Sequence, residues 1–347
     1  MHAQSHSPVD VLQKPAIASK RAWTRWSRLA LAGIGLYAAV VASTGIYWSF
    51  QPAPFDVKTV ALAQVGGEAS QLAPGAVTVS TVEQVARTLL EKPGGFLSND
   101  MSVPGIYLDN MPNWEYGALK EVRDSLRAIR NDFSRSQTQS IENLNLRKAD
   151  EFLNYNVDSW ILPSTESEFR EGIEALERYL ASLLRADDNS AMFFVRADNL
   201  AAYLAVVEKR LGSYAQRLSA SVDDAELTAA LVAGGGSASE GLPERVKTPW
   251  QEVDDVFFEA RGYAWALLHM FKALTIDFDH VLRDKNAMAS VQQVIRDLEG
   301  ATVRRWSPVV INGQGFGILA NHSLILASYL ARANTAVLDL RILLQQG

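Results

Sequence analysis

The stretch LALAGIGLYAAVVASTGIYWS, residues 29–49, contains no charged side chain, and none occurs between Arg28 and Asp56. A helix needs about 20 consecutive apolar residues to cross the hydrocarbon core of a bilayer. Aromatic residues, which are enriched at membrane interfaces, precede the stretch and end it: Trp23, Trp26, Tyr47 and Trp48. Residues 29–49 are therefore predicted to form a transmembrane helix.

Basic residues are concentrated before this stretch, against the single acid Asp10: Lys14, Lys20, Arg21, Arg25 and Arg28. Segments rich in Lys and Arg stay in the cytoplasm, so residues 1–28 are predicted to be a cytoplasmic tail and the rest to lie outside. The alternative is a cleaved signal peptide, which has an apolar core of about 7–15 residues and small residues at its cleavage site. The longer apolar run and the bulky sequence Tyr47-Trp48-Ser49-Phe50 favour an anchor.

Small residues recur every four positions within the predicted span, at Gly35, Ala39 and Ser43. Such a ridge lets two transmembrane helices approach closely, so it is a candidate for homo-oligomer contact. The competing interpretation is that small residues are common in membrane helices and carry no such role here.

The composition is that of a folded protein, with 48% hydrophobic and 21% charged residues among 347. Cysteine is absent, which excludes disulfides, thiolate metal sites and a cysteine nucleophile. The net charge is −6 although the N-terminal tail is basic, so the remainder is more acidic than the whole. We therefore expect no nucleic-acid partner, because phosphate binding depends on basic side chains.

Turn residues and helix signals divide the chain beyond the anchor. The predicted parts are a spacer at 50–79, a helical region at 80–221, a flexible loop or linker at 222–247 and a second helical region at 248–347. A capping box at Ser80 to Glu83 is expected to start the first helical region, and Thr248-Pro249 the second. Whether the two helical regions share one core is open at this stage.

Apolar residues recur at spacings of three and four in five segments, 119–133, 169–183, 200–218, 253–274 and 319–344. The fourth is expected to belong to a helix that continues to about residue 286. Stripes of this kind need a partner surface, so the helices should pack together as a bundle. The predicted fold is all-α, an N-terminal transmembrane helix followed by a helical bundle, and strand patterns are scarce.

The stretch 93–116 combines many turn residues with aromatic and acidic side chains. Its candidate binding residues are Asn99, Asp100, Asp109, Asn113, Trp114 and Glu115. Aromatics beside carboxylates suit a saccharide or peptide, and convergent carboxylates could perform acid/base chemistry. In the competing structural interpretation, Asn113 caps the following helix, Asn99 and Asp100 make turns, and Trp114 holds the loop against the bundle.

Other candidate motifs are weaker. The glycines of Gly313-Gln314-Gly315-Phe316-Gly317 are expected to form a tight turn, because no second strand follows to complete a dinucleotide site. His269 and His280 lie three helical turns apart and cannot share an ion, and His322 is expected to be a satisfied core histidine. The acidic run 252–259 is interpreted as a solvated helix face. We therefore predict no metal and no cofactor.

Several sequence boxes resemble a bacterial family of single-pass inner-membrane proteins of unknown function. They are PGGFLSND at 93–100, DNMPNWEYG at 109–117, SRSQ at 134–137, SWILPS at 159–164 and RLSA at 217–220. The resemblance implies a Gram-negative setting, an inner-membrane anchor and a periplasmic C-terminal domain. It implies no activity, because the family supplies no catalytic residues to carry over, and the segment at 234–237 matches none of its boxes.

The leading functional hypothesis is a non-enzymatic envelope protein whose periplasmic helical domain binds another protein through the 93–116 loops. Helices with bundle periodicity and the absence of a recognised catalytic motif favour it. The alternative is an envelope enzyme, or a glycan or peptide binder, that uses Asp100, Asp109 or Glu115. An enzyme would need at least two of these carboxylates around one cleft.

Overall fold

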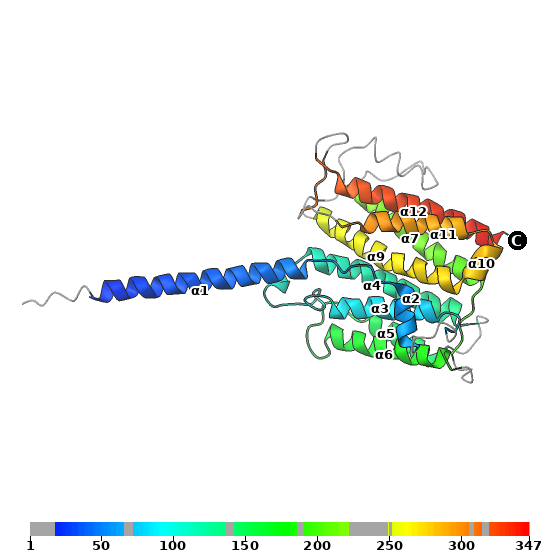
Figure 1. Ribbon diagram of the computed structural model, residues 1–347, viewed down its shortest axis with the longest axis horizontal. Coiled ribbons are helices and arrows are strands. Elements are labelled where there is room, and N and C mark those ends of the chain that lie inside the picture. The colour runs from blue at the N-terminus through cyan, green and yellow to red at the C-terminus, as the bar shows by residue number, and fades with distance from the viewer. Residues whose placement is uncertain are drawn as a thin grey trace, which may run out of the picture. The chain divides into compact units, whose positions relative to one another are not determined.

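The computed structural model describes residues 18–65, 72–135, 142–185, 191–221, 249, 252–304, 309–313 and 319–346. The chain divides into two compact units, one that ends at Tyr47 and one that begins at Trp48. Helix α1 (Ala18–Trp48) makes up the described part of the first unit. The second unit is a bundle of helices, which we call the helical domain (Figure 1).

Helix α1 contains the predicted apolar span. Its segment Trp26–Trp48 has a mean hydropathy of 1.9 and almost no burial. Leu29 and Leu36 are 65% and 68% exposed, which would be costly for such side chains in water. One apolar helix near the N-terminus is thereby confirmed, of a length and composition that suit either a membrane span or a signal sequence.

The helical domain begins with two helices that overlap the predicted spacer. They are α2 (Val57–Gln64) and α3 (Ala76–Glu91). The expectation of an irregular spacer over 50–79 is therefore wrong in part. The predicted capping box is wrong as well, because Ser80 and Glu83 lie buried inside α3 and Gly75 holds its N-cap position. Asp277 takes over the capping role from another helix, since its carboxylate accepts the Thr78 amide at 2.7 Å.

The longer of the remaining helices follow with alternating direction, and the short α10 connects α9 to α11 (Figure 1). They are α4 (Asn110–Ala128), α5 (Leu144–Leu153), α6 (Thr165–Leu183), α7 (Ala197–Ala220), α9 (Val253–Asp277), α10 (Asp279–Asp284), α11 (Met288–Thr302) and α12 (His322–Gln345). A π-helical turn at Ile129–Phe133 extends α4. Within these residues the only β-type pairing is an isolated bridge between Asn312 and Asn321. The all-α prediction is confirmed, and the predicted linker at 222–247 lies outside the described residues.

Two predicted helix boundaries are wrong. The helix expected from 249 to about 286 ends at Asp277, and α10 and α11 follow it as separate helices. Asn286 lies at the predicted end, adopts a positive φ of 51° and separates α10 from α11. The last helix begins at His322, after the exposed Leu319 that was assigned to its apolar stripe.

Helix α9 lies at the centre of the domain, between the α3–α4 layer and α7, α11 and α12 (Figure 1). Its residues from 256 to 271 are buried without interruption, and they include Glu259, Arg261 and His269 besides apolar side chains. One continuous core includes Leu119 of α4, Leu204 of α7 and Leu330 of α12. The two predicted helical regions therefore share one core.

Helices α4 and α9 cross closely at two glycines. A Cβ atom added to Gly117 would lie 1.9 Å from the Glu259 carbonyl oxygen, and one added to Gly262 would lie 1.9 Å from that of Trp114. Both distances are far below van der Waals contact, so only glycine fits at either position. The crossing brings the polar side chains of both helices within reach of α7.

The bundle has two ends, which the chain direction distinguishes. We call the end with the C-terminus of α3 and the N-termini of α4, α9 and α12 the entry end. Trp48 lies there against Gly94, and Gln51 accepts hydrogen bonds from Arg261 of α9 at 3.1–3.2 Å. The opposite end, which contains the N-termini of α3 and α7 and the C-termini of α9 and α12, is the far end.

Candidate functional site

The six candidate residues of the 93–116 stretch lie at the entry end, but they do not form one exposed surface. Trp114 and Glu115 are both fully buried in the second turn of α4. The Trp114 ring packs against Trp265 of α9, with 5.1 Å between ring centroids. Because neither side chain reaches the surface, their assignment to a contact surface is wrong.

Glu115 organises the loop that precedes α4. Its carboxylate accepts the Leu97 and Ser98 amides at 2.9 Å and the Ser98 hydroxyl at 2.6 Å, and it forms a buried ion pair with Lys92. A buried carboxylate is stable only when its oxygens are paired in this way. These contacts explain why Glu115 is buried, and no ligand is needed to explain it.

The other four candidates are also bound within the fold. Asp100 accepts the amide and hydroxyl of Ser102, and Asp109 holds the N-cap position of α4, where it accepts the Asn110 amide. The expectation that Asn113 caps this helix is wrong, because α4 begins three residues earlier and Asn113 donates to Asp255 at 2.6 Å. Asn99 is buried and donates to the Ser159 carbonyl at 2.7 Å, which joins this loop to the next one.

Large apolar side chains also reach solvent at the entry end, and the sequence analysis did not select them. On the described loops they are Met101, Val103, Ile106 and Tyr107; Trp160, Ile161 and Leu162; and Val303, Val309 and Leu319. Leu162 is 90% exposed and Tyr107 is 77% exposed. The sequence feature that could have identified them is the presence of large apolar residues in turn-rich segments, where such residues are not expected to belong to the core.

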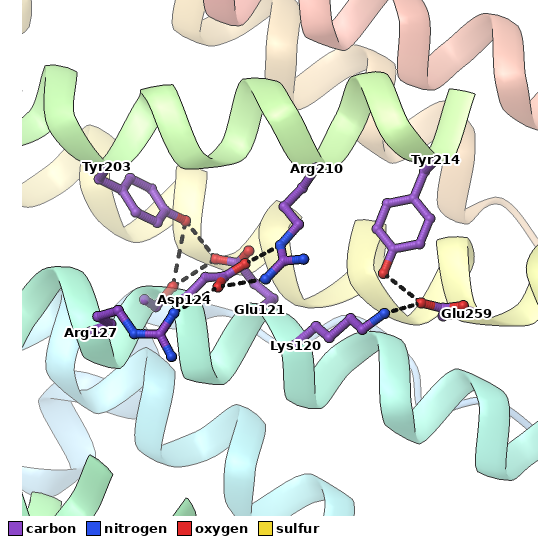
Figure 2. A network of polar contacts seen from close by, with 9 residues as sticks. Lys120, Glu121, Asp124, Arg127, Tyr203, Arg210, Tyr214 and Glu259 are labelled. Carbon is purple, nitrogen blue, oxygen red and sulfur yellow. Dashed lines mark hydrogen bonds and ion pairs between the residues drawn. The ribbon is translucent and has the colours of Figure 1, made fainter. Parts of the chain in front are cut away.

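A buried polar network joins α4, α7 and α9 next to the glycine crossing (Figure 2). Glu121 of α4 is buried and accepts the hydroxyls of Ser125 at 2.6 Å and Tyr203 at 2.5 Å. Burial, with a smaller contribution from the charge of Asp124, raises the pKa of Glu121 to about 8. Carboxyl groups with a raised pKa are frequent in catalytic sites, so this network is a candidate on electrostatic grounds.

Charge pairs complete the network on either side of Glu121. Asp124 accepts two hydrogen bonds from Arg210 of α7, at 2.7 and 3.0 Å. Glu259 of α9 pairs with Lys120 at 2.5 Å and accepts the Tyr214 hydroxyl (Figure 2). It also pairs with Arg217 of α7 at 2.7 Å. The interpretation of 252–259 as a solvated face is therefore wrong for Glu259, which is 5% exposed.

This network holds α4, α7 and α9 together. Its carboxylates are buried and their oxygens face side chains from neighbouring helices, and neither of the two grooves described next reaches them. Paired charges of this kind fix which helices face one another more than they add stability. We therefore expect the network to help specify the register of α4 and α7 against α9.

Two adjoining grooves lie at the far end of the domain. The first encloses 680 Å³ between the N-terminus of α7 and the C-terminal parts of α10 and α12, and the second encloses 610 Å³ beside the N-terminus of α3. Both are lined by Val195, Arg196 and His280. Their walls combine apolar and charged side chains, among them Phe193, Ile276, Leu344, Lys58, Asp198 and Lys285.

The histidines do not come together. His269 is buried, accepts the Phe55 amide at Nε2 and contacts the Trp265 carbonyl through Nδ1, and burial lowers its pKa to about 4. His280 lies in the grooves. His322 accepts the Ile311 amide at 2.9 Å, which confirms its expected role as a satisfied histidine. In the described part of the chain, no group of three or more His, Asp or Glu side chains could hold a metal ion.

Comparisons with known proteins identify a family but no characterised relative. No curated protein matches the chain, and no solved structure matches it either. One family model covers nearly its whole length, from residue 19 to residue 347. The chain therefore belongs to the bacterial family described as "Uncharacterized protein conserved in bacteria (DUF2333)".

Proposed function

We propose that the protein is a single-pass protein of the bacterial inner membrane whose helical domain lies in the periplasm and binds another envelope protein. Residues 1–28 form the cytoplasmic tail in this proposal, and residues 29–49 cross the lipid bilayer. The exposed apolar surface of α1 and the basic residues that precede it support this topology. No nucleic acid is expected to bind, since the domain carries an acidic excess.

The pair of grooves at the far end is the observation that carries the binding function. The grooves share Val195, Arg196 and His280, and their walls combine apolar and charged side chains. A small apolar ligand is normally enclosed by its pocket, whereas such a surface suits the mixed side chains of a polypeptide. We therefore place the partner site at the far end, in place of the 93–116 loops.

The alternative of an envelope enzyme or glycan binder with Asp100, Asp109 or Glu115 has less support. Asp109 is a helix cap, Asp100 stabilises its own turn and Glu115 is buried against Lys92. A general acid must reach its substrate, and acid/base pairs must share one cleft. These separate structural roles argue against a shared catalytic cleft.

A homo-oligomer through the anchor is a second part of the proposal. Gly35 has open space around its Cα, and Ser43 uses its hydroxyl within α1 by donating to the Ala39 carbonyl at 2.8 Å. The ridge of Gly35, Ala39 and Ser43 is thus available to a second copy. A Gly35→Leu variant should lose the crosslinked oligomer, and an unchanged oligomer would remove this part of the proposal.

Site-specific photo-crosslinking in native membranes tests the partner site. A photoreactive amino acid is placed at Ile276 or His280, which line the grooves, and at Val206, an exposed control position on α7. The same partner protein should be captured from both groove positions and not from Val206. An Arg196→Glu change, which alters the charge of the shared wall, should weaken that capture.

Three results would contradict the partner site. Equal capture at all three positions would show unspecific contact, and no capture at either groove position would leave the grooves without a protein partner. Capture of only the same chain would replace the envelope partner by a homo-oligomer through the far end.

A further inference from the structure

We propose that the entry end of the helical domain is a second membrane-contact surface, whose apolar loop tips lie in the interface of the bilayer that α1 crosses. This inference rests on the proposed anchoring of α1 and concerns the lipid contact of the domain. The surface consists of three loops: 92–109 between α3 and α4, 154–164 between α5 and α6, and the described residues of 303–321 between α11 and α12.

Chain connectivity places these loops close to the membrane. Trp48 ends α1 and is also the first residue of the helical domain, and Gln51 is already held by Arg261. Three residues span at most about 10 Å. The entry end therefore begins within about 10 Å of the point where the predicted span ends.

Residues close to the end of the predicted span also contact the first and third loops. Arg261 donates to the carbonyl oxygens of Ala301 and Val303, and Arg304 stacks on Phe50 with 5.2 Å to its ring centre. Trp48 lies against Gly94, at the start of the loop that carries Ile106 and Tyr107.

The second loop is joined to the first by one hydrogen bond. The Asn99 side chain donates to the carbonyl of Ser159, the residue before the exposed run Trp160-Ile161-Leu162. Figure 1 shows the loops after α3, α5 and α11 at the same end of the domain. The three loops thus form one side of the domain, which faces the bilayer in a short-tethered protein.

Exposed apolar side chains are concentrated on this side. More than half of the large apolar residues that are exposed on the described part of the helical domain belong to these three loops. They include the amphipathic rings of Tyr107 and Trp160, at 77% and 55% exposure, and the aliphatic Leu162 at 90%. Aromatic rings with a polar group prefer the headgroup region, and aliphatic tips prefer the acyl boundary below it.

Charge does not explain the contact. The described ionisable groups of the first two loops are mainly Asp100, Asp109, Asp158 and the buried Lys92. With Arg304 of the third loop, these charges form no basic patch that anionic lipid would attract, so apolar burial is expected to supply the attraction. Contact with uncharged phosphatidylcholine is therefore expected.

The absence of cysteine allows a direct test on the full chain. Single changes Leu162→Cys and Ile106→Cys place an environment-sensitive fluorophore on two loops. Leu36→Cys reports on the span, and Met192→Cys, 45% exposed at the far end, is the control. Each labelled protein is reconstituted into phosphatidylcholine vesicles, and quenching by a spin-labelled lipid is compared with quenching by aqueous iodide.

We expect the spin-labelled lipid to quench the fluorophores at positions 162 and 106 at least half as strongly as the fluorophore at position 36. It should not quench the fluorophore at position 192. Quenching at Leu36 but not on the loops would overturn the inference and leave the anchor intact. No lipid quenching at Leu36 would contradict the anchor itself. Loop labels shielded from iodide but not quenched by lipid would indicate contact with a second copy, which also overturns the inference.

Discussion

His269 ties the segment that follows the span to the core, and this contact depends on its protonation state. The neutral ring accepts the Phe55 amide at 3.0 Å, which the protonated ring cannot do. Burial lowers the pKa of His269 to about 4, from 6.5. The folded pKa is the lower one, so the contribution of His269 is complete above pH 6.5 and is lost as the pH falls toward 4.

A His269→Gln variant should therefore have a flatter stability profile between pH 6.5 and 4. The glutamine oxygen can still accept the Phe55 amide but does not titrate, and the wild-type loss across this window is on the order of 3 kcal/mol. Urea unfolding of the full chain in detergent at several pH values measures the difference. The exposed His280→Gln is the control, and parallel profiles for wild type and His269→Gln would contradict the assignment.

Glu121 is expected to change the stability with pH in the opposite direction to His269. Its pKa is raised from 4.5 to about 8, so the folded state holds a proton that the unfolded state releases. Stability should therefore fall as the pH rises from 4.5 to 8, by at most ~1.4 kcal/mol per pH unit from this group. Glu121→Gln keeps an acceptor for Ser125 and Tyr203 and should remove this part of the slope.

The test compares the urea midpoints of wild type and Glu121→Gln at pH 5, 7 and 9. The variant should gain stability relative to wild type as the pH rises. Glu91→Gln, at the exposed C-terminal end of α3, is the matched control and should show no such gain. A constant difference at all three pH values would mean that Glu121 does not change its proton occupancy on folding.

At the scale of helices, the crossing of α4 and α9 leaves room only for glycine. Gly117→Ala and Gly262→Ala each introduce a Cβ atom 1.9 Å from a facing carbonyl oxygen. Backbones cannot move apart without disturbing the polar network beside them, so each change should cost about 3 kcal/mol or more. The double variant should lose less than the sum, because one separation accommodates both methyl groups.

Thermal unfolding monitored by circular dichroism measures these losses. Gly212→Ala on α7 is the control, because its Cβ atom would have 3.6 Å to the nearest side chain. Alanine is the better helix former, so this change should be neutral or stabilising by up to ~1 kcal/mol. Unchanged stability in Gly117→Ala or Gly262→Ala would mean that the helices are farther apart than the structure shows.

Long helices could be predicted from the sequence, whereas the shorter α2 and α5 were not identified individually. α6 and the core residues of α7 were identified by their spacing alone. α2 was missed because its eight residues are too few to show a period, and α3 was started too late because Asp277, distant in sequence, supplies its cap. The end of α9 at Asp277 was missed, because α10 resumes a helical conformation at Asp279 after a single residue.

The candidate site was harder to predict than the fold, for a physical reason. Carboxylates and aromatic side chains serve both in ligand binding and in holding loops to the core. Only their burial in the folded structure distinguishes these two roles. Glu115 illustrates this, because its partner Lys92 lies in a different element and no spacing rule connects them. The grooves could not be predicted at all, since they form where the ends of α3, α7, α9, α10 and α12 meet.

At the scale of the whole molecule, an anchor and a cleaved signal peptide predict different N-termini for the mature chain. Trp48 is the last residue of α1 and also packs on the core of the helical domain beside Gly94. Cleavage near Ser49 would remove this packing together with the charged tail. An anchor keeps both, so the mature chain should still contain residues 1–28.

Mass spectrometry of the protein purified from native membranes should therefore recover N-terminal peptides that end at Lys20 or Arg28. The protein should stay in the pellet after alkaline carbonate extraction, and alkaline phosphatase fused after Gly347 should be active, since that enzyme folds outside the cytoplasm. The control is a variant with Leu36→Arg and Val40→Arg, which places two charges in the span at a cost of about 2.5–3.5 kcal/mol each and should reduce insertion. A mature chain that begins at or after Ser49 and is released by carbonate would establish a signal peptide, and the entry end would then face solvent.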